Sequence, residues 1–311
     1  MGAHPIVFEP LGRPPPAALT EARVALHWAV QVVAAAGAAL IPAVPDDSHT
    51  SLEWSPAGRL LVGGMTPRKA RLGLRPSDFT LVVVDATGNP QRELPLAGRT
   101  LEAAFAWTAD ALGSSALHEP SYEMPDHIVA HGGAFGATDP DALAELARWY
   151  ASADALLRDF LASRPYARED VEPGTLEGFP GPPATDSSRQ AETPPRASPV
   201  RCWPHHFDIA TLVSLPGGAP SGARTIGVGL SPGDGSYAEP YFYVTPWPYP
   251  QSPTLPGLPA GAAWHQSGWV GAVLTATAIF RDAGGSPAAR AERVREFLDV
   301  AARASAALLG G

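Results

Sequence analysis

The sequence predicts an α+β protein of two similar halves, in which antiparallel sheets are covered by helices. Three observations support this fold class. Stretches with apolar residues at helical spacing alternate with groups of short β-like runs. The order helix, several strands, helix occurs twice in the 311 residues, which suggests an internal duplication without residue-level identity. The 45% hydrophobic content is enough to fill a large core, so we expect residues 1–138 and 139–311 to form one integrated domain.

The first helix is expected between Val24 and Ile41 and is stopped by Pro42. This Ala- and Val-rich stretch could be mistaken for a membrane span or a signal core. It carries His27 and Gln31, however, and Glu9 precedes it. Its apolar residues follow one helical stripe: Leu26, Val30, Val33, Gly37 and Leu40. We therefore expect an amphipathic helix of a globular protein and no membrane contact.

The rest of the first half contains five β-like runs and a second helix. The runs cover residues 49–54, 60–62, 70–74, 79–85 and 91–96, with a turn at Gly88 and Asn89 between the last two. Thr100 is the expected N-cap of the helix, with Glu102 in its first turn and Gly113 just after its end.

The second half begins with a helix that has Asp139 as N-cap and Pro140 as first residue, and that ends near Arg164 and Pro165. Its apolar face is made by Leu143, Leu146, Tyr150, Ala153, Leu157 and Phe160. Strand-like runs follow at 207–215, 225–230, 241–245 and 269–274. A last helix is capped by Ser286 and Pro287 and closed by Gly310 and Gly311.

Residues 166–199 contain the polar, proline-rich run GFPGPPATDSSRQAETPPRASP, which cannot bury a core. We expect an exposed, mobile insert. Such a segment is usually a plain linker, although its Pro pairs could dock in an aromatic groove of a partner protein.

Composition excludes several classes of function. The formal charge of −9 and the scattered Lys and Arg residues argue against a nucleic-acid partner. The single cysteine, Cys202, rules out an internal disulfide framework and favours a reducing compartment, so the cytoplasm is the expected location. The turns GMTPRK and SPGDGS lack phosphate-loop spacing, and no Gly-x-Ser-x-Gly or Gly-x-Gly-x-x-Gly occurs.

Several blocks in order along the chain resemble the domain-of-unknown-function family 5996 of bacteria and fungi. They are ALHWAVQVV, HTSLEWSPAGRL, ALAELARWYASADALLRDFLASR, SPV, FDIA, SPGDGSYAEPYFYVTPWPYP and REFLDVAARASAAL. The first resembles the family's Leu-His-x-Trp-x-Gln helix and places His27 and Gln31 in family positions. The resemblance implies an architecture and a set of polar positions, and it implies no defined activity.

The chain departs from the family at most of those polar positions. The family strand Asn-His-Trp-Trp-His keeps its second histidine as His49, whereas the first falls on Asp46 and the tryptophans on Asp47 and Ser48. A family histidine becomes Arg201 after Ser-Pro-Val, and a family glutamate becomes Arg224 in SGAR. A late family Pro-Tyr-Glu falls on TAT, which removes another acid. Cations repel a divalent ion, so we expect no metal site, and we expect Asp46 to pair with Arg201 or Arg224.

The stretch RCWPHHFDIATLVSL raises the question of a catalytic centre. In an extended strand His205 and His206 would point to opposite faces and could not share one metal, whereas His206 and Asp208 would share a face as a base and its orienting carboxylate. A hydrogen-bonded structural pair is the competing interpretation. Cys202 would lie about 13 Å from His206 along a strand, too far for proton transfer, and is expected to be a buried apolar residue.

We expect a small-molecule-binding protein with a polar cleft between its sheets, lined by His49, Trp203, His206, Asp208, Glu239, Tyr241 and His265. Arg201 and Arg224 would favour an anionic ligand. His49 with Ser51 and Glu53 could equally be an exposed strand face, Tyr241 could be core, and His265 could belong to a loop packed by tryptophans. The alternatives are a metal- or acid/base-dependent enzyme using His49, His206 and Asp208, and an interaction protein acting through its insert.

Overall fold

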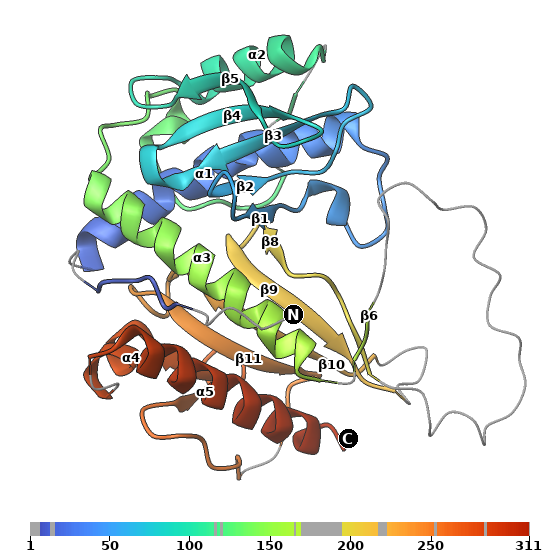
Figure 1. The fold of residues 1–311 in the computed structure, drawn as a ribbon, viewed down its shortest axis with the longest axis vertical. Helices are drawn as coiled ribbons and strands as arrows, with labels where there is room; N and C mark the ends of the chain where they lie inside the picture. The colour runs from blue at the N-terminus through green and yellow to red at the C-terminus, as the bar shows by residue number, and fades with distance from the viewer. Residues whose placement is uncertain are drawn as a thin grey trace, which may run out of the picture.

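The computed structural model describes residues 7–12, 16–114, 117–118, 121–164, 166–168, 195–216, 223–251, 254–282 and 285–310. It contains two separate sheets with helices packed on them, and the predicted α+β class is confirmed. Figure 1 shows the first sheet in the upper part of the molecule, the second in the lower part, and α3 (Pro140–Ala162) running diagonally past both.

The first sheet is an antiparallel meander whose strands are neighbours in chain order. Its strands are β1 (Glu53–Ser55), β2 (Leu60–Val62), β3 (Ala70–Arg75), β4 (Thr80–Asp85) and β5 (Pro90–Pro95). They match four of the five predicted runs closely. Helix α1 (Pro16–Leu40) packs on β3, and α2 (Leu101–Leu112) packs on α1 and β5.

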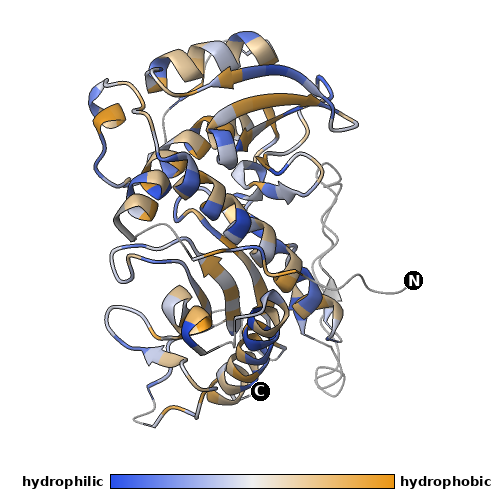
Figure 2. Ribbon diagram, turned by 60° about the vertical axis from the view of Figure 1, so that its left-hand side comes forward, coloured by the Kyte–Doolittle hydropathy of each residue, from blue (hydrophilic) through white to orange (hydrophobic). Residues whose placement is uncertain are grey.

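The second sheet is larger and its strand order is not sequential: β12-β13-β11-β10-β9-β7-β6, with β8 on the same edge of β9. Its strands are β6 (Ala167–Arg168), β7 (Arg196–Ala197), β8 (Arg201–Trp203), β9 (Asp208–Ser214), β10 (Thr225–Ser231), β11 (Tyr241–Trp247), β12 (Ala263–His265) and β13 (Gly271–Thr275). Helices α3 and α5 (Pro287–Leu308) pack on this sheet. Along α5, hydrophobic and hydrophilic residues lie on different sides (Figure 2). The two halves therefore share an order of elements but not a strand topology.

Side chains cap three of the helices as predicted. Thr100 Oγ1 accepts a hydrogen bond from Ala103 N at 3.1 Å, and Ser286 Oγ accepts one from Ala289 N at 3.1 Å. Asp139 Oδ1 accepts one from Asp141 N at 2.9 Å. These acceptors satisfy backbone N–H groups that have no partner within the helix. The N-termini of these three helices were therefore predictable from local sequence.

One continuous hydrophobic core joins the two halves, because its buried side chains come from both. The sheets also meet directly. Leu52 N donates to Cys202 O at 2.9 Å and Cys202 N donates to Leu52 O at 2.7 Å, and both residues are fully buried. This backbone pair joins the chain just before β1 to β8.

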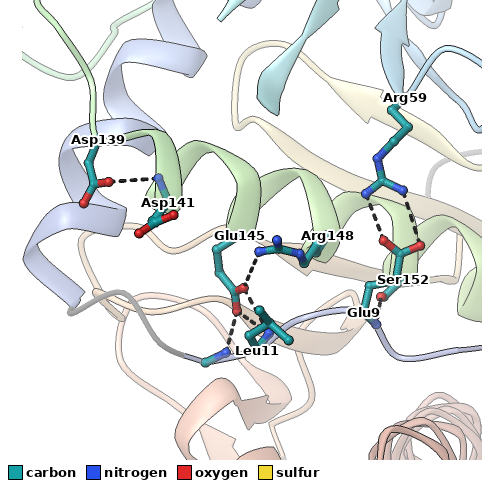
Figure 3. Close-up of polar contacts among 9 residues, drawn as sticks. Glu9, Leu11, Arg59, Asp139, Asp141, Glu145, Arg148 and Ser152 are labelled. Carbon is teal, nitrogen blue, oxygen red and sulfur yellow. Dashed lines mark hydrogen bonds and ion pairs between the residues drawn. The ribbon is translucent and has the colours of Figure 1, made fainter. Parts of the chain in front are cut away.

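The N-terminal segment 7–12 is bound to α3 by a fully buried carboxylate. Glu145 accepts hydrogen bonds from Leu11 N at 2.9 and 3.0 Å and from Gly12 N at 2.7 Å, and Arg148 lies beside it at 3.3 Å (Figure 3). Ser152 Oγ accepts from Glu9 N at 3.0 Å. Phe8 is buried edge-on against Trp149, with ring centroids 5.3 Å apart.

The same segment also reaches the first sheet and α4 (Ala276–Asp282). Glu9 forms an ion pair with Arg59 at 2.9 Å (Figure 3). Gly12 has a φ of +67°, and a Cβ there would lie 2.8 Å from the Phe280 ring of α4. The segment is thus a strap across α3 that touches parts of both halves.

The structure corrects four predictions about the elements. The run 49–54 is not one strand, because Ser48–Thr50 forms a short 3₁₀ helix, η1, before β1. The predicted bounds of the insert, 166–199, are too wide, because β6 and β7 lie within them and pair in parallel. Residues 169–194 lie outside the described residues. The sequence analysis missed β8, β12 and α4, which are short or irregular in pattern. The first helix begins at Pro16, eight residues before the predicted start.

Helix α1 is long and apolar enough to cross a membrane by length and composition, over Ala18–Leu40. Most of that stretch is buried inside the protein, as in the core helix of many soluble proteins. This single helix is weak evidence for a membrane span.

Loss of the Glu145 carboxylate is expected to destabilise the fold. Glu145→Ala removes the buried, charged acceptor of two backbone N–H groups and of Arg148, and we expect the free energy of unfolding to fall by about 2–4 kcal/mol. Glu145→Gln keeps the size but turns an N–H₂ group toward N–H donors, so it should also destabilise. Urea denaturation measures both. Glu292→Ala, which removes an exposed ion pair with Arg295, is the matched control and should cost less than about 1 kcal/mol. Equal losses for Glu145→Ala and the control would contradict the assignment.

Candidate functional site

A cavity of about 620 Å³ lies between α1, η1 and the turn that joins β8 to β9. The residues that line it come from both halves: Gln31, Ala34, Ala35, Ala38, Ala39, Asp46, Asp47, His49, Thr50, His118, Ser121, Tyr122, Trp203, Pro204 and His205. Three of the predicted ligand-binding residues, Asp46, His49 and Trp203, are among them. The cavity therefore brings together three of the predicted residues, with the remaining lining coming from residues that were not predicted.

Small side chains make one wall of this cavity. Ala34 and Ala38, and likewise Ala35 and Ala39, are one helical turn apart on α1 and line it together. Gly37 lets η1 approach the same helix, because a Cβ there would lie 2.4 Å from the carbonyl oxygen of His49. The run of small residues at the end of α1 thus holds η1 close and leaves space beside it.

Gln31 ties the helix to both other walls of the cavity. Its Nε2 donates to His27 O at 2.9 Å and to Pro204 O at 2.8 Å. Its Oε1 accepts a hydrogen bond from the Tyr122 hydroxyl at 2.5 Å. Burial raises the pKa of Tyr122 to about 12 against the opposing effect of that bond, so Tyr122 is a neutral donor at physiological pH. Gln31 is fully buried, and its amide is occupied by structural contacts.

The two adjacent histidines are not in a strand, and the prediction that they point to opposite faces is wrong. Residues 204–207 form the turn of the β8–β9 hairpin, in which Trp203 pairs with Asp208. Phe207 adopts a left-handed φ of +58° because its ring is buried against Tyr150 and His27. The imidazoles of His205 and His206 consequently lie together, with centroids 4.1 Å apart. Alternation of side chains holds only in extended backbone.

Proximity of the two rings does not complete a metal site. Within the described part of the chain, no three or more His, Cys, Asp and Glu side chains gather in a group that could hold a metal ion. Partial burial and the neighbouring His206 lower the pKa of His205, which keeps its ring neutral near pH 7. His205 faces the cavity and contacts the edges of Tyr122 and Trp203, at centroid distances of 6.0 and 6.4 Å.

The cavity carries carboxylates rather than guanidinium groups. Asp46 and Asp47 line it, whereas no Arg or Lys is among its described lining residues. Partial burial raises the pKa of Asp46, but hydrogen bonds from Ser48 and the charge of Arg201 outweigh it and hold that pKa below its ordinary value. Asp46 is therefore ionised at neutral pH.

Neither predicted arginine serves the site as expected. Arg201 donates to Ser51 Oγ at 3.0 Å and acts on Asp46 only through its charge, without an ion pair to it among the described contacts. Arg224 is far from this role: it donates to the carbonyl oxygens of Leu309 at 2.7 Å and of Pro216, and so caps the end of α5. The predicted pairing of Asp46 with Arg224 is wrong, because helix-end carbonyls compete for the guanidinium.

Asp208 belongs to a second polar cluster, on β9 and β11. The Tyr243 hydroxyl donates to Asp208 Oδ2, and the Tyr241 hydroxyl donates to Asp234 Oδ2 at 2.5 Å. Tyr243 on β11 reaches Asp208 on β9 across β10, which lies between them. Gly229 of β10 leaves room for the Tyr243 ring, because a Cβ at this position would lie 2.8 Å from it. Burial raises the pKa of Asp208, opposed by the Tyr243 bond and the nearby His206. The predicted His206–Asp208 pair interacts through charge, and the hydroxyl of Tyr243 is the direct partner.

Glu239 and His265 have structural contacts. Glu239 Oε2 accepts from Thr277 N and Thr277 Oγ1, each at 2.7 Å, and so caps α4. His265 stacks on Trp269 with centroids 4.3 Å apart and bonds Tyr237 Oη at 3.1 Å and Ser267 O at 2.7 Å. Tyr241 is 3% exposed, as its core interpretation required. These three residues, His206 and Asp208 are not among the described lining residues of the cavity.

Cys202 is fully buried, in agreement with its predicted apolar role. Burial raises the pKa of its thiol, so no thiolate nucleophile forms there at neutral pH.

Sequence analysis missed much of the cavity. Asp47 and Gln31 were not predicted as ligand-binding residues, and the sequence around His118, Ser121 and Tyr122 has no periodic pattern. The one local signal was the alanine-rich composition of α1, from which only an amphipathic helix was predicted.

No protein-family model, no curated protein and no solved structure matches this chain. The resemblance to family 5996 therefore stays a prediction.

His27 makes the stability of this region depend on pH. Its Nε2 donates to Pro204 O at 2.8 Å, and burial lowers its pKa to about 4 against the opposing effect of that bond. The unfolded chain binds a proton here below about pH 6.5, whereas the folded protein does so only near pH 4. Stability is therefore complete above pH 6.5 and falls by about 3 kcal/mol as the pH drops to 4.

His27→Gln keeps a donor for Pro204 O but cannot titrate. We expect the variant to lose less unfolding free energy than the wild type between pH 7 and pH 4.5, measured by urea denaturation in matched buffers. Equal losses in the two proteins would show that His27 is not responsible.

Proposed function

We propose that this protein binds a small molecule with a flat apolar body and a protonated amine, in the cavity between α1, η1 and the β8–β9 turn. The observation that carries the proposal is one cavity that combines aromatic walls with carboxylates from another element. The proposal keeps the predicted class of small-molecule binding and replaces the anionic ligand by a cationic one.

Size and lining support a drug-sized ligand. The volume of about 620 Å³ lies within the range of roughly 300–1,000 Å³ that ligand pockets show. Trp203, Tyr122 and His205 offer ring faces and edges, and the alanines of α1 leave room for a planar group between them. A flat apolar body would bury these surfaces with little polar desolvation.

The charged groups of the cavity favour a cationic ligand. Asp46 and Asp47 are acidic groups of the lining, His205 is neutral near pH 7, and the chain has a formal charge of −9. A protonated amine would pair with the carboxylates and could lie over an indole or phenol face. A carboxylate ligand would meet like charge in the same place.

Isothermal titration calorimetry with matched probes tests this proposal. Tryptamine, 3-methylindole and indole-3-acetate share a ring and differ in charge. We expect tryptamine to bind at least about 10-fold more tightly than indole-3-acetate, which corresponds to about 1.4 kcal/mol. Tighter binding of the anion, or no binding of any probe, would overturn the proposal.

Two variants locate the binding. Ala38 is exposed at the cavity, so Ala38→Phe should fill it and weaken tryptamine binding at least about 10-fold without disturbing the core. Ala106→Phe, at an exposed position of α2, is the matched control and should leave binding unchanged. Unchanged tryptamine binding in Ala38→Phe would place the site elsewhere.

The double variant Asp46→Asn/Asp47→Asn tests the charge. Asparagine keeps the acceptor for Ser48 N at position 46 and tolerates the left-handed φ of +56° at position 47. We expect the preference for tryptamine over indole-3-acetate to fall several-fold. A preference that survives in full would exclude these carboxylates as its source.

A further inference from the structure

A second cavity adjoins the first and shares one residue with it. It measures about 370 Å³ and is lined by Trp28, Glu123, Met124, Asp126 and His131 together with Tyr122, which also lines the first cavity. Tyr122 is therefore the side chain that stands between the two spaces.

The position of Tyr122 is set by one hydrogen bond. Its hydroxyl donates to the buried Gln31 Oε1 at 2.5 Å, while its residue remains 38% exposed. A side chain anchored at its tip and open to solvent along its ring separates two cavities without being part of the core. A ligand that occupies both cavities has to pass along this ring.

The second cavity repeats the chemistry of the first. It has an aromatic wall, Trp28, whose Nε1 donates to Pro125 O at 2.9 Å and is thereby fixed. It has two carboxylates, Glu123 and Asp126, the latter paired with His131 at 2.9 Å in an exposed position. The described lining of the two cavities together holds four carboxylates and no Lys or Arg.

We propose that the ligand is an elongated dication, with one amine near Asp46 and Asp47 and a second amine near Glu123 and Asp126, and that Tyr122 determines the length it accepts. This inference rests on the proposed function of the first cavity. Two acidic aromatic subsites separated by one ring select a molecule with positive charge at both ends, because a neutral second end leaves the carboxylates of the second cavity without a new partner.

A series of substituted tryptamines tests the second subsite. N-(ω-aminoalkyl)tryptamines with linkers of three to eight methylenes carry a second amine, and N-alkyltryptamines of the same length lack it. We expect the second amine to tighten binding about 5- to 10-fold at an optimal linker length, measured by calorimetry at low ionic strength. Equal affinities within every matched pair would overturn the inference, whereas tryptamine binding itself would still support the proposed function.

Variants of Glu123 and Asp126 test whether these carboxylates cause the tighter binding of the second amine. Glu123→Gln/Asp126→Asn should abolish the gain from the second amine and leave tryptamine affinity unchanged, while Glu102→Gln, an exposed acid on α2, should change neither. A gain that persists in the double variant would overturn the placement of the second amine.

The role of Tyr122 is tested by the dependence of binding affinity on linker length. Tyr122→Ala should join the two cavities and broaden the optimum to several lengths, whereas Tyr122→Phe keeps the ring but loses the bond to Gln31 and should broaden the optimum less. An optimum that is equally sharp in the alanine variant would exclude Tyr122 as the length-determining residue. Thermal unfolding of both variants verifies that they are folded.

Discussion

Two backbone hydrogen bonds between Leu52 and Cys202 join the sheets of this protein, and the geometry of its cavity depends on them. Both residues are fully buried, so their N–H and C=O groups need partners and obtain them from each other. The pair fixes the start of β1 beside β8. As a consequence, η1, which precedes β1, and the turn that follows β8 face each other across the end of α1. The cavity is the space that remains between them.

Buried polar side chains on the helices act mainly by binding irregular backbone. Gln31 and His27 of α1 both donate to Pro204 O, and the Tyr150 hydroxyl of α3 donates to Phe207 O at 2.6 Å. Glu145 of α3 binds the N–H groups of the N-terminal strap in the same way. A turn or an extended segment inside a protein has no ladder to satisfy its backbone groups, so helix side chains supply the partners. The β8–β9 turn owes its defined shape to three such bonds.

The polar residues discussed above are of two kinds: those bonded mainly to other parts of the protein and those that border the cavity. Asp208, Glu239, Tyr241, His265 and Arg224 have protein partners, although Oδ1 of Asp208 is buried without one among the described residues. Asp46, Asp47, His205 and Tyr122 instead border an open space. A ligand in the cavity reaches groups of the second kind without entering the core, although Tyr122 is bonded to Gln31 and Asp46 to Ser48 N. That difference is why the cavity supports a binding function better than the tyrosine–carboxylate cluster on β9 and β11.

Local sequence was enough to predict the α+β class, the caps at Thr100, Asp139 and Ser286, and most strands of the first sheet, because caps and periodicity act within a few residues of chain. It also identified Cys202 as buried. It could not determine how the halves meet, and so it assigned seven residues to one cleft where the structure divides them among a cavity, a turn, the second sheet and the start of α4. Likewise, the sequence predicted that His205 and His206 belong to a strand. In the structure they lie in a turn, where Phe207 has a positive φ and packs against His27 of α1 and Tyr150 of α3. These points depend on contacts between distant segments of the chain, 35 residues apart for Tyr243 and Asp208 and 173 for Gln31 and Pro204, and local spacing carries no information about them.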